Sequence, residues 1–200
     1  KGGPFSRFYY DIDTVISWST DRNTYRGFLG TSNRPLERPA SVQHFFRPGL
    51  TWPRRSQRGL SVRVLPAGCI FADKGPAIFT KGDDIVSLLA NLSLANSAAF
   101  RAFVSAQMAF GSYEVGVIQR TPVPEPLVDS ASILADLASA AWSLKRELDS
   151  VVEISHAFTC PALLQQAGVT LSERSSSWLD RLQTIETALS DIYEKVDRIA

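Results

Sequence analysis

The stretch GLTWPRRSQRGLSVRVLPAGCIFADKGPAIF, residues 49–79, decides the fold that the sequence predicts. After a loop with three arginines, residues 60–65 (LSVRVL) alternate between apolar and polar side chains, which is typical of a half-buried strand. Two turn-forming sequences follow, and each precedes a short apolar segment, at 69–71 and at 77–79, that we expect to be a further strand. We therefore predict a small antiparallel β unit (residues 49–79) that carries an arginine-rich loop at one end.

The segments around the β unit predict more strands and then helices. The further predicted strands are 5–10, 14–18, 42–46 and 113–119, and 21–39 is predicted to be a long exposed segment. The predicted helices of this part are 85–94 and 100–110. Asp83 and Asp84 are suited to cap the first of these helices, and Asn96 or Ser97 is suited to cap the second, because their side-chain oxygens accept bonds from free backbone N–H groups.

Three prolines within residues 122–126 predict a domain boundary, because proline fits neither a helix interior nor a central strand. We expect one domain at 1–127 and a second at 128–200. The second has two stretches in which apolar residues recur every three or four positions, which predicts a long antiparallel helical hairpin. Ser172 or Ser175 to Ser177 are candidate caps of its second helix. The predicted fold class is α+β, a small mixed or antiparallel β domain with helices followed by this hairpin.

The composition is that of an ordinary folded protein. Of 200 residues, 44% are hydrophobic and 20% are charged, and no apolar run approaches the roughly 20 residues of a membrane span. Cys69 and Cys160 are more consistent with two free thiols in a reducing cytoplasm than with a disulfide bond. The chain begins at Lys1 without an initiator methionine or a signal-like apolar segment, so we expect a cytoplasmic piece of a longer protein.

The net charge of +1 hides an asymmetry along the chain. Residues 1–81 contain 13 Lys and Arg against 5 Asp and Glu, a net charge of +8, whereas residues 82–200 contain 8 against 15, a net charge of −7. Ten of the 13 cations are arginines, whose planar guanidinium suits phosphate oxygens and guanine edges. A solvated basic face and a nucleic-acid contact both explain this pattern.

The inventory of reactive residues does not indicate a catalytic centre. The histidines His44 and His156 and the two cysteines are scattered, so we expect no metal site. The sequence has no phosphate-binding glycine loop and no nucleophile elbow. We therefore expect no catalytic residue and no cofactor in this chain.

DNA binding remains the chemistry that the residues support. Cations of an exposed loop contact phosphates, and an arginine that reaches a base edge adds sequence discrimination. The candidate DNA-binding residues are Arg54, Arg55, Ser56, Gln57, Arg58, Arg63, Trp52, Arg47, Lys74, Lys81, Arg22 and Arg26. For Arg63 a DNA contact and an internal ion pair are equally open. Trp52 could stack on a base, although packing in the core is the alternative that we favour.

Several segments, in order, resemble one known family. They are Lys1–Phe5 with Val15–Trp18, Gly49–Trp52, Ser61–Arg63, Pro66–Phe71, Lys74–Pro76, Leu92–Phe100, Tyr113–Gln119 with Pro122–Pro124, Glu153–Phe158 and Asp197–Ile199. This pattern is similar to the target-recognition region of large bacterial adenine-specific DNA methyltransferases of phage-defence systems of the BREX and DISARM kind, and of related single-chain restriction–modification enzymes. The Asn-Pro-Pro-Tyr catalytic motif and the methyl-donor pocket of that family have no counterpart here.

The resemblance implies a fragment that binds double-stranded DNA and positions it for methylation by an upstream catalytic domain of the same chain. It implies S-adenosylmethionine as the cofactor of the parent protein, and other defence-system proteins as possible partners. Such enzymes extrude the target adenine from the duplex before they methylate it. The alternative is a protein–protein scaffold of a defence complex, which the helical seams motivate. An independent small enzyme is a third hypothesis that lacks a visible active centre.

Overall fold

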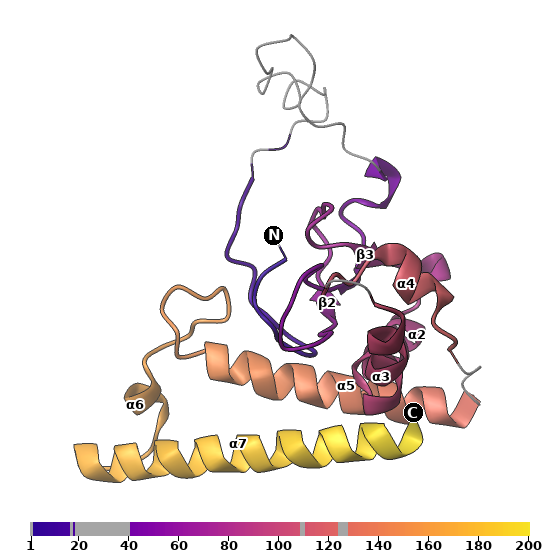
Figure 1. The fold of residues 1–200 in the computed structure, drawn as a ribbon. Helices are drawn as coiled ribbons and strands as arrows, with labels where there is room; N and C mark the ends of the chain where they lie inside the picture. Colours follow the sequence, from indigo (N-terminus) through magenta and orange to yellow (C-terminus); the bar gives the residue numbers. More distant parts are fainter. Residues whose placement is uncertain (1, 17, 19–40, 109–110, 124–127) are drawn as a thin grey trace.

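The computed structural model describes residues 2–16, 18, 41–108, 111–123 and 128–200 (Figure 1). Its short elements are η1 (Val42–His44), β1 (Gly49–Thr51), β2 (Arg63–Leu65), β3 (Ala77–Ile78) and η2 (Lys81–Asp83). Its α-helices are α2 (Ile85–Asn96), α3 (Ala98–Gln107), α4 (Val115–Arg120), α5 (Val128–Asp149), α6 (Ala162–Gln165) and α7 (Leu171–Ile199). A small antiparallel sheet with helices and a long hairpin is an α+β fold, as predicted.

Three short antiparallel strands form the sheet, in the order β2–β1–β3. The central strand pairs Leu50 with Val64 on one side and with Ile78 on the other, and the Leu50 side chain is fully buried. The strands predicted at 60–65 and 77–79 are therefore confirmed, although each is shorter than predicted. The strand predicted at 69–71 is not formed, and these residues belong to loops and turns around an isolated bridge.

The strand predictions for the N-terminal part are wrong wherever the structure describes it. Phe8 forms only one parallel bridge, with Arg63, because its left-handed φ of 69° turns the chain away from the sheet. Residues 14–16 and 18 form no strand, and 42–46 contains the 3₁₀ helix η1. The exposed segment predicted at 21–39 lies outside the described residues.

The strand predicted at 113–119 is a helix, α4. The Tyr113 backbone N–H donates to the carbonyl of Arg54 at 2.7 Å, and the helix then begins with the N–H groups of Val117 and Ile118 donating to the carbonyl of Glu114. Val117 and Ile118 are both buried. A short apolar run is compatible with a buried strand and with a buried helix, and here the helix forms.

Capping and one buried amide fix the position of α2 and α3. Asp84 caps α2 by accepting a bond from the Ser87 N–H, and Ser97 caps α3 by accepting one from the Phe100 N–H, as predicted. Asn96 has a different role from the predicted cap. Its side chain is buried and bonds both the N–H (3.1 Å) and the carbonyl (2.8 Å) of Val62, which attaches α2 to the β unit.

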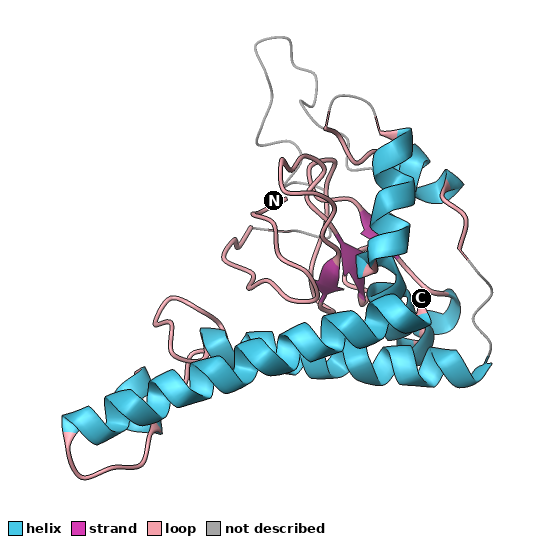
Figure 2. Ribbon diagram, turned by 60° about the horizontal axis from the view of Figure 1, so that its bottom comes forward, coloured by secondary structure: helices cyan, strands magenta, loops and turns pink. Residues whose placement is uncertain are grey.

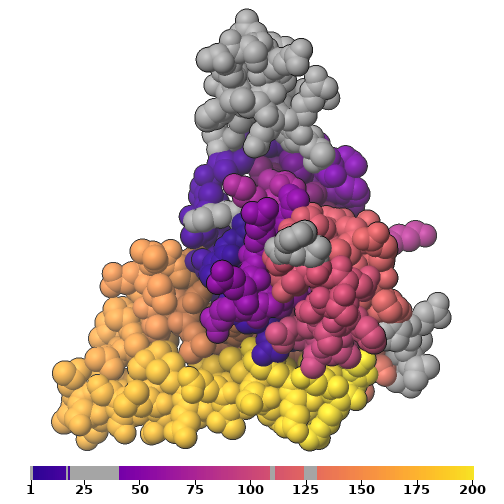
Figure 3. All heavy atoms as spheres, in the orientation of Figure 1, coloured from indigo at the N-terminus to yellow at the C-terminus, as the bar shows by residue number. Residues whose placement is uncertain are grey.

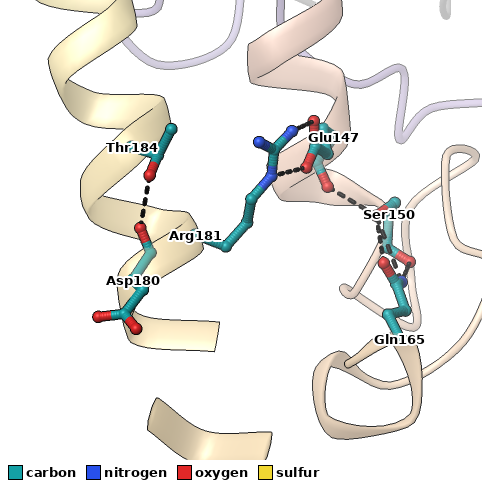
Figure 4. Close-up of polar contacts among 6 residues, drawn as sticks. All are labelled: Glu147, Ser150, Gln165, Asp180, Arg181 and Thr184. Carbon is teal, nitrogen blue, oxygen red and sulfur yellow. Dashed lines mark hydrogen bonds and ion pairs between the residues drawn. The ribbon is translucent and has the colours of Figure 1, made fainter. Parts of the chain in front are cut away.

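Helices α5 and α7 run antiparallel and lie side by side over part of their length, and the start of α7 extends beyond the end of α5 next to α6 (Figures 1 and 2). A bidentate ion pair joins them, with both Arg181–Glu147 nitrogen–oxygen distances at 2.6 Å (Figure 4). The cap of α7 is Thr170, which forms a capping box with Glu173 and replaces the predicted serine caps. The hairpin is therefore fixed at its turn by capping and along its length by packing and an ion pair.

One apolar core extends from the β unit into the hairpin. Leu50 and Trp52 belong to the same buried cluster as Ala141 of α5 and Ile192 and Val196 of α7. The Phe8 ring stacks on Tyr193 of α7 with 5.6 Å between the ring centroids. The division into domains at 1–127 and 128–200 stays a prediction.

Among the described residues, no single helix combines the length and apolar character that a membrane span requires. Helices α2 and α3 together meet both criteria, but they are bent by 66° relative to each other.

Candidate nucleic-acid interface

Residues 54–59, which we call the arginine loop, are attached to the rest of the protein by backbone contacts at their first two residues, and the next residue, Leu60, is buried. The Arg54 N–H donates to the carbonyl of Lys74 at 3.2 Å, and Arg55 forms an isolated antiparallel bridge with Ser112. Within the loop, the Ser56 hydroxyl accepts a bond from the Arg58 N–H at 3.2 Å. These contacts hold a polar loop against the sheet and against the chain segment that leads into α4. Figure 3 shows the purple β unit between the indigo N-terminal segment and the rose-coloured helices α3 and α4.

Two carboxylates surround the guanidinium of Arg54. Its Nε donates to Glu114 Oε1 at 2.9 Å, and its Nη1 forms an ion pair with Asp73. The bonds to Glu114, and then those to Asp73, raise the pKa of Arg54. The positive charge of Arg54 is thus matched within the protein, and its geometry does not favour a DNA contact.

Arg47 is also paired internally. Its Nε donates to Asp83 Oδ1 at 2.9 Å and its Nη2 donates to the Thr80 carbonyl at 3.1 Å. Its guanidinium lies 5.3 Å from the centre of the Phe79 ring. The pair closes the turn that contains η2, so Arg47 has a structural role here. Lys81 lies in the same turn and is exposed.

The structure places Trp52 and Arg63 in the interior. Trp52 is 1% exposed and its indole N–H donates to the Tyr113 carbonyl at 2.9 Å. Arg63 is 4% exposed, and its guanidinium donates to the carbonyls of Gly2 and Pro4. Burial lowers the pKa of Arg63 to about 10. For Trp52 the packing alternative holds. Arg63 does not have the external position, and the bonds of its guanidinium to the described residues go to backbone carbonyls and not to a carboxylate.

Arg63 also forms one wall of a cavity of about 420 Å³. The other walls come from residues 10–16 and 18, and from the loop after β2, with Phe46 and Phe71 among the apolar side chains. Asp11 and Asp13 also line it. This mixture of aromatic and acidic groups does not match a polyanion.

The candidates that remain exposed are Arg55, Gln57, Arg58, Lys74 and Lys81, and Ser56 is half-buried. In the part of the chain that the structure describes, neither Arg55 nor Arg58 forms an ion pair with a carboxylate. Arg55 still interacts with Glu114 and slightly lowers its pKa, after the larger effects of Ser112 and Arg54. Arg22 and Arg26 lie outside the described residues. The structure thus brings Arg55, Gln57, Arg58 and Lys74 together around the arginine loop.

The sequence analysis missed one cation, Arg101 of α3. Its guanidinium lies 5.9 Å from the centre of the Phe5 ring, and the guanidinium of Arg58 lies 5.2 Å from the same ring. Arg101 is the only charged residue of α3, AAFRAFVSAQ. A single charge inside an otherwise uncharged helix next to a buried core was the signal that could have identified it.

Among the described residues, no group of three or more His, Cys, Asp or Glu side chains has a geometry that could hold a metal ion. Cys69 and Cys160 are both free thiols, as predicted. Burial raises the pKa of the Cys69 thiol, which makes it a weaker nucleophile at neutral pH.

Comparison with known proteins gives a distant relative and no family assignment. No protein-family model matches the chain. Over 202 residues, which include 98% of this chain, it is 23% identical to the adenine-specific methyltransferase BrxX of Escherichia coli O9:H4 (strain HS). The chain spans only 16% of the length of that protein. The similarity is consistent with a fragment related to an adenine-specific methyltransferase of a Brx system.

Proposed function

We propose that this chain is a DNA target-recognition module of an adenine-specific DNA methyltransferase, and that it binds double-stranded DNA through the arginine loop. The observation that carries the proposal is the exposure of Arg55 and Arg58 on a loop that is bonded to the protein backbone at its start and followed by the buried Leu60, in a chain distantly similar to such a methyltransferase. Loops on a rigid scaffold are common positions for recognition residues.

The roles within the loop follow from its chemistry. Arg55, Arg58 and Lys74 contact phosphates, which supplies affinity without sequence preference. Gln57 is uncharged and exposed, with a side-chain amide that can bond an adenine edge in the major groove. The methyl donor S-adenosylmethionine and the catalytic residues belong to an upstream domain of the parent protein, in the cytoplasm of a bacterium.

A binding titration with labelled duplex DNA at about 0.1 M salt tests the proposal. The salt exponent is the size of the slope of the logarithm of the binding constant against the logarithm of salt concentration, and each phosphate contact contributes about 0.9 to it. The variant Arg55→Ala/Arg58→Ala removes two such contacts, so it should bind roughly 60-fold more weakly than the unmodified chain. The control is Arg146→Ala/Lys195→Ala, which removes two exposed positive charges from the hairpin helices. Equal losses in both variants would mean that total charge, and not the arginine loop, determines binding.

A second candidate function is the docking of a protein partner at the turn of the hairpin. Ile154 is 90% exposed and Val169 is 96% exposed, and both lie between α5 and α7. Apolar side chains exposed to this degree are typical of contact surfaces when they cluster. Sedimentation of the unmodified chain and of Ile154→Ser/Val169→Ser tests whether the partner is a second copy. A concentration-dependent dimer of the unmodified chain that is lost in the variant would support a second copy as the partner. A monomer in both cases would contradict a second copy as the partner.

A further inference from the structure

Two arginines from different parts of the chain share one aromatic ring. Arg58 comes from the arginine loop and Arg101 comes from the first turn of α3, and both guanidiniums lie within 6 Å of the centre of the Phe5 ring, at 5.2 and 5.9 Å. A guanidinium at this distance from a ring is held by cation–π attraction, which leaves its N–H groups available. We call Phe5, Arg58 and Arg101 the arginine pair site.

The backbone is shaped to allow this approach. Gly59 follows Arg58 directly and has a φ of +105°, a conformation that favours glycine. A Cβ atom at Gly59 would lie 3.2 Å from Nη2 of Arg101. On the other side, the Arg101 N–H donates to the carbonyl of Ser97, the cap of α3. Both arginines are therefore positioned by a turn and by a capped helix.

The charges of this site have no matching carboxylate among the residues that the structure describes. In the described part of the chain, neither Arg58 nor Arg101 pairs with a carboxylate, and Nε of Arg101 is buried without a hydrogen-bond acceptor. A third cation, Arg7, lies over the ring of Tyr193 at 3.8 Å. Burial lowers the pKa of Arg7 and the positive charge of Arg101 lowers it further, whereas Tyr193 and Asp197 act in the opposite direction. Asp197 itself accepts a bond from the Ala98 N–H at 2.7 Å.

We propose that Arg58 and Arg101 together bind one phosphodiester group of duplex DNA, between the arginine loop and α3. Two guanidinium groups that have no carboxylate partner in the described part of the chain suit the oxygens of a phosphate, which accept several N–H bonds at once. The contact rests on the proposed DNA-binding function. It fixes the position of the duplex on the protein, because one phosphate is bound both by the arginine loop and by a residue of α3. A phosphate contact positions the duplex and leaves sequence discrimination to other side chains.

The test compares duplex affinity across a salt series for the unmodified chain, Arg101→Gln, Arg101→Lys and Arg58→Gln/Arg101→Gln. Arg58→Gln/Arg101→Gln removes the whole phosphate contact, so it should lower the salt exponent by about one and weaken binding roughly eightfold at 0.1 M salt. Arg101→Gln alone leaves Arg58 on the phosphate and should cause a smaller decrease in both quantities. Arg101→Lys keeps the charge and should restore the salt exponent, with only part of the affinity, because lysine lacks the planar fork. Thermal unfolding of each variant identifies any loss of folding, and Arg101→Lys remains informative if Arg101→Gln does not fold.

A second measurement distinguishes a DNA phosphate from a free anion. Inorganic phosphate, added at ionic strength matched with chloride, should compete with DNA for the unmodified chain and not for the double variant. If phosphate binds but Arg58→Gln/Arg101→Gln keeps the full salt exponent for DNA, the site is a free-anion site and the proposal is wrong. If the unmodified chain does not bind duplex DNA at all, the proposed function itself fails. If the unmodified chain binds DNA and Arg58→Gln/Arg101→Gln has the same salt exponent, only the arginine pair site is wrong.

Discussion

At the scale of single residues, the described arginines differ in whether a carboxylate of the protein already neutralises their positive charge. Arg54 is paired with Glu114 and Asp73, and Arg47 is paired with Asp83. Arg55 and Arg58 extend from the same loop as Arg54 but have no such pair among the described residues. The number of cations in the loop is therefore a poor guide to its attraction for DNA, and their individual partners decide it.

Release of Arg54 from its carboxylates should strengthen DNA binding. In the variant Asp73→Asn/Glu114→Gln the guanidinium keeps its position next to two amides but regains an unmatched charge, so we expect a salt exponent larger by about one. The matched control is Asp180→Asn/Glu186→Gln, which removes two exposed acidic charges from α7. A salt series with labelled duplex measures the difference. An equal change in both variants would show that only the net charge of the chain matters.

At the scale of elements, one buried amide bonds α2 to the segment that leads into β2. Asn96 near the end of α2 bonds both backbone groups of Val62, close to the start of β2. The same segment bonds Phe8 through the Val62 carbonyl at 2.8 Å, so three parts of the chain meet there. The attachment fixes where the arginine loop, which ends just before β2, lies relative to α3.

Replacement of Asn96 by alanine should destabilise the fold. The change leaves the buried N–H of Val62 without its acceptor and should lower the free energy of unfolding by about 2–3 kcal/mol. Asn91→Ala on the same helix is the control, since the Asn91 amide bonds only the Ser87 carbonyl one turn earlier. Urea denaturation of both variants measures the effect. Similar, small losses for both would contradict the role given to Asn96.

The sequence was sufficient for the long helices and insufficient for the short elements. The amphipathic periodicity of α5 and α7 and the caps at Asp84 and Ser97 are local signals, and the structure confirms them. The strand prediction for 113–119 is wrong because its few apolar residues fit a strand or a helix, and no local signal shows that Val117 and Ile118 join the buried core from a helix.

For the candidate site, the sequence predicts the loop but not which of its charges are paired within the protein, and the DNA-binding role of the loop stays a prediction. The partners of Arg54 lie 19 and 60 residues away, so no local pattern could show that its charge is matched. The same holds for Arg58 and Arg101, which only the folded chain brings to one ring. Long-range packing therefore decides which cations face solvent.

At the scale of the whole molecule, the N-terminal segment connects the β unit to the hairpin. Nζ of Lys145 on α5 donates to the Ser6 hydroxyl at 2.6 Å and to the Arg7 carbonyl at 2.9 Å. The next residues along the segment contact the same hairpin, where the Tyr9 ring meets Trp142 edge-on with 5.9 Å between centroids. The basic half and the acidic half of the chain are thus packed together as parts of one structure.

Lys145 should make the stability of the molecule depend on pH. Burial, followed by the charge of Arg7, lowers the pKa of Lys145 to about 8 from 10.5. Between these values the unfolded chain holds a proton that the folded chain has lost, so this group makes the free energy of unfolding rise with pH. The difference in that free energy between the unmodified chain and Lys145→Met should increase by about 1–2 kcal/mol from pH 7.5 to 9.5. Denaturation at several pH values measures it, and a difference that decreases with pH would contradict the burial of this charge.

The measurement that tests the central claim most directly is the salt dependence of duplex DNA affinity for the unmodified chain and for Arg55→Ala/Arg58→Ala. If the exposed arginines hold the DNA backbone, the logarithm of the binding constant falls linearly with the logarithm of salt concentration, and the variant has an exponent smaller by about two. The same exponent in both chains, with measurable binding, would contradict the account.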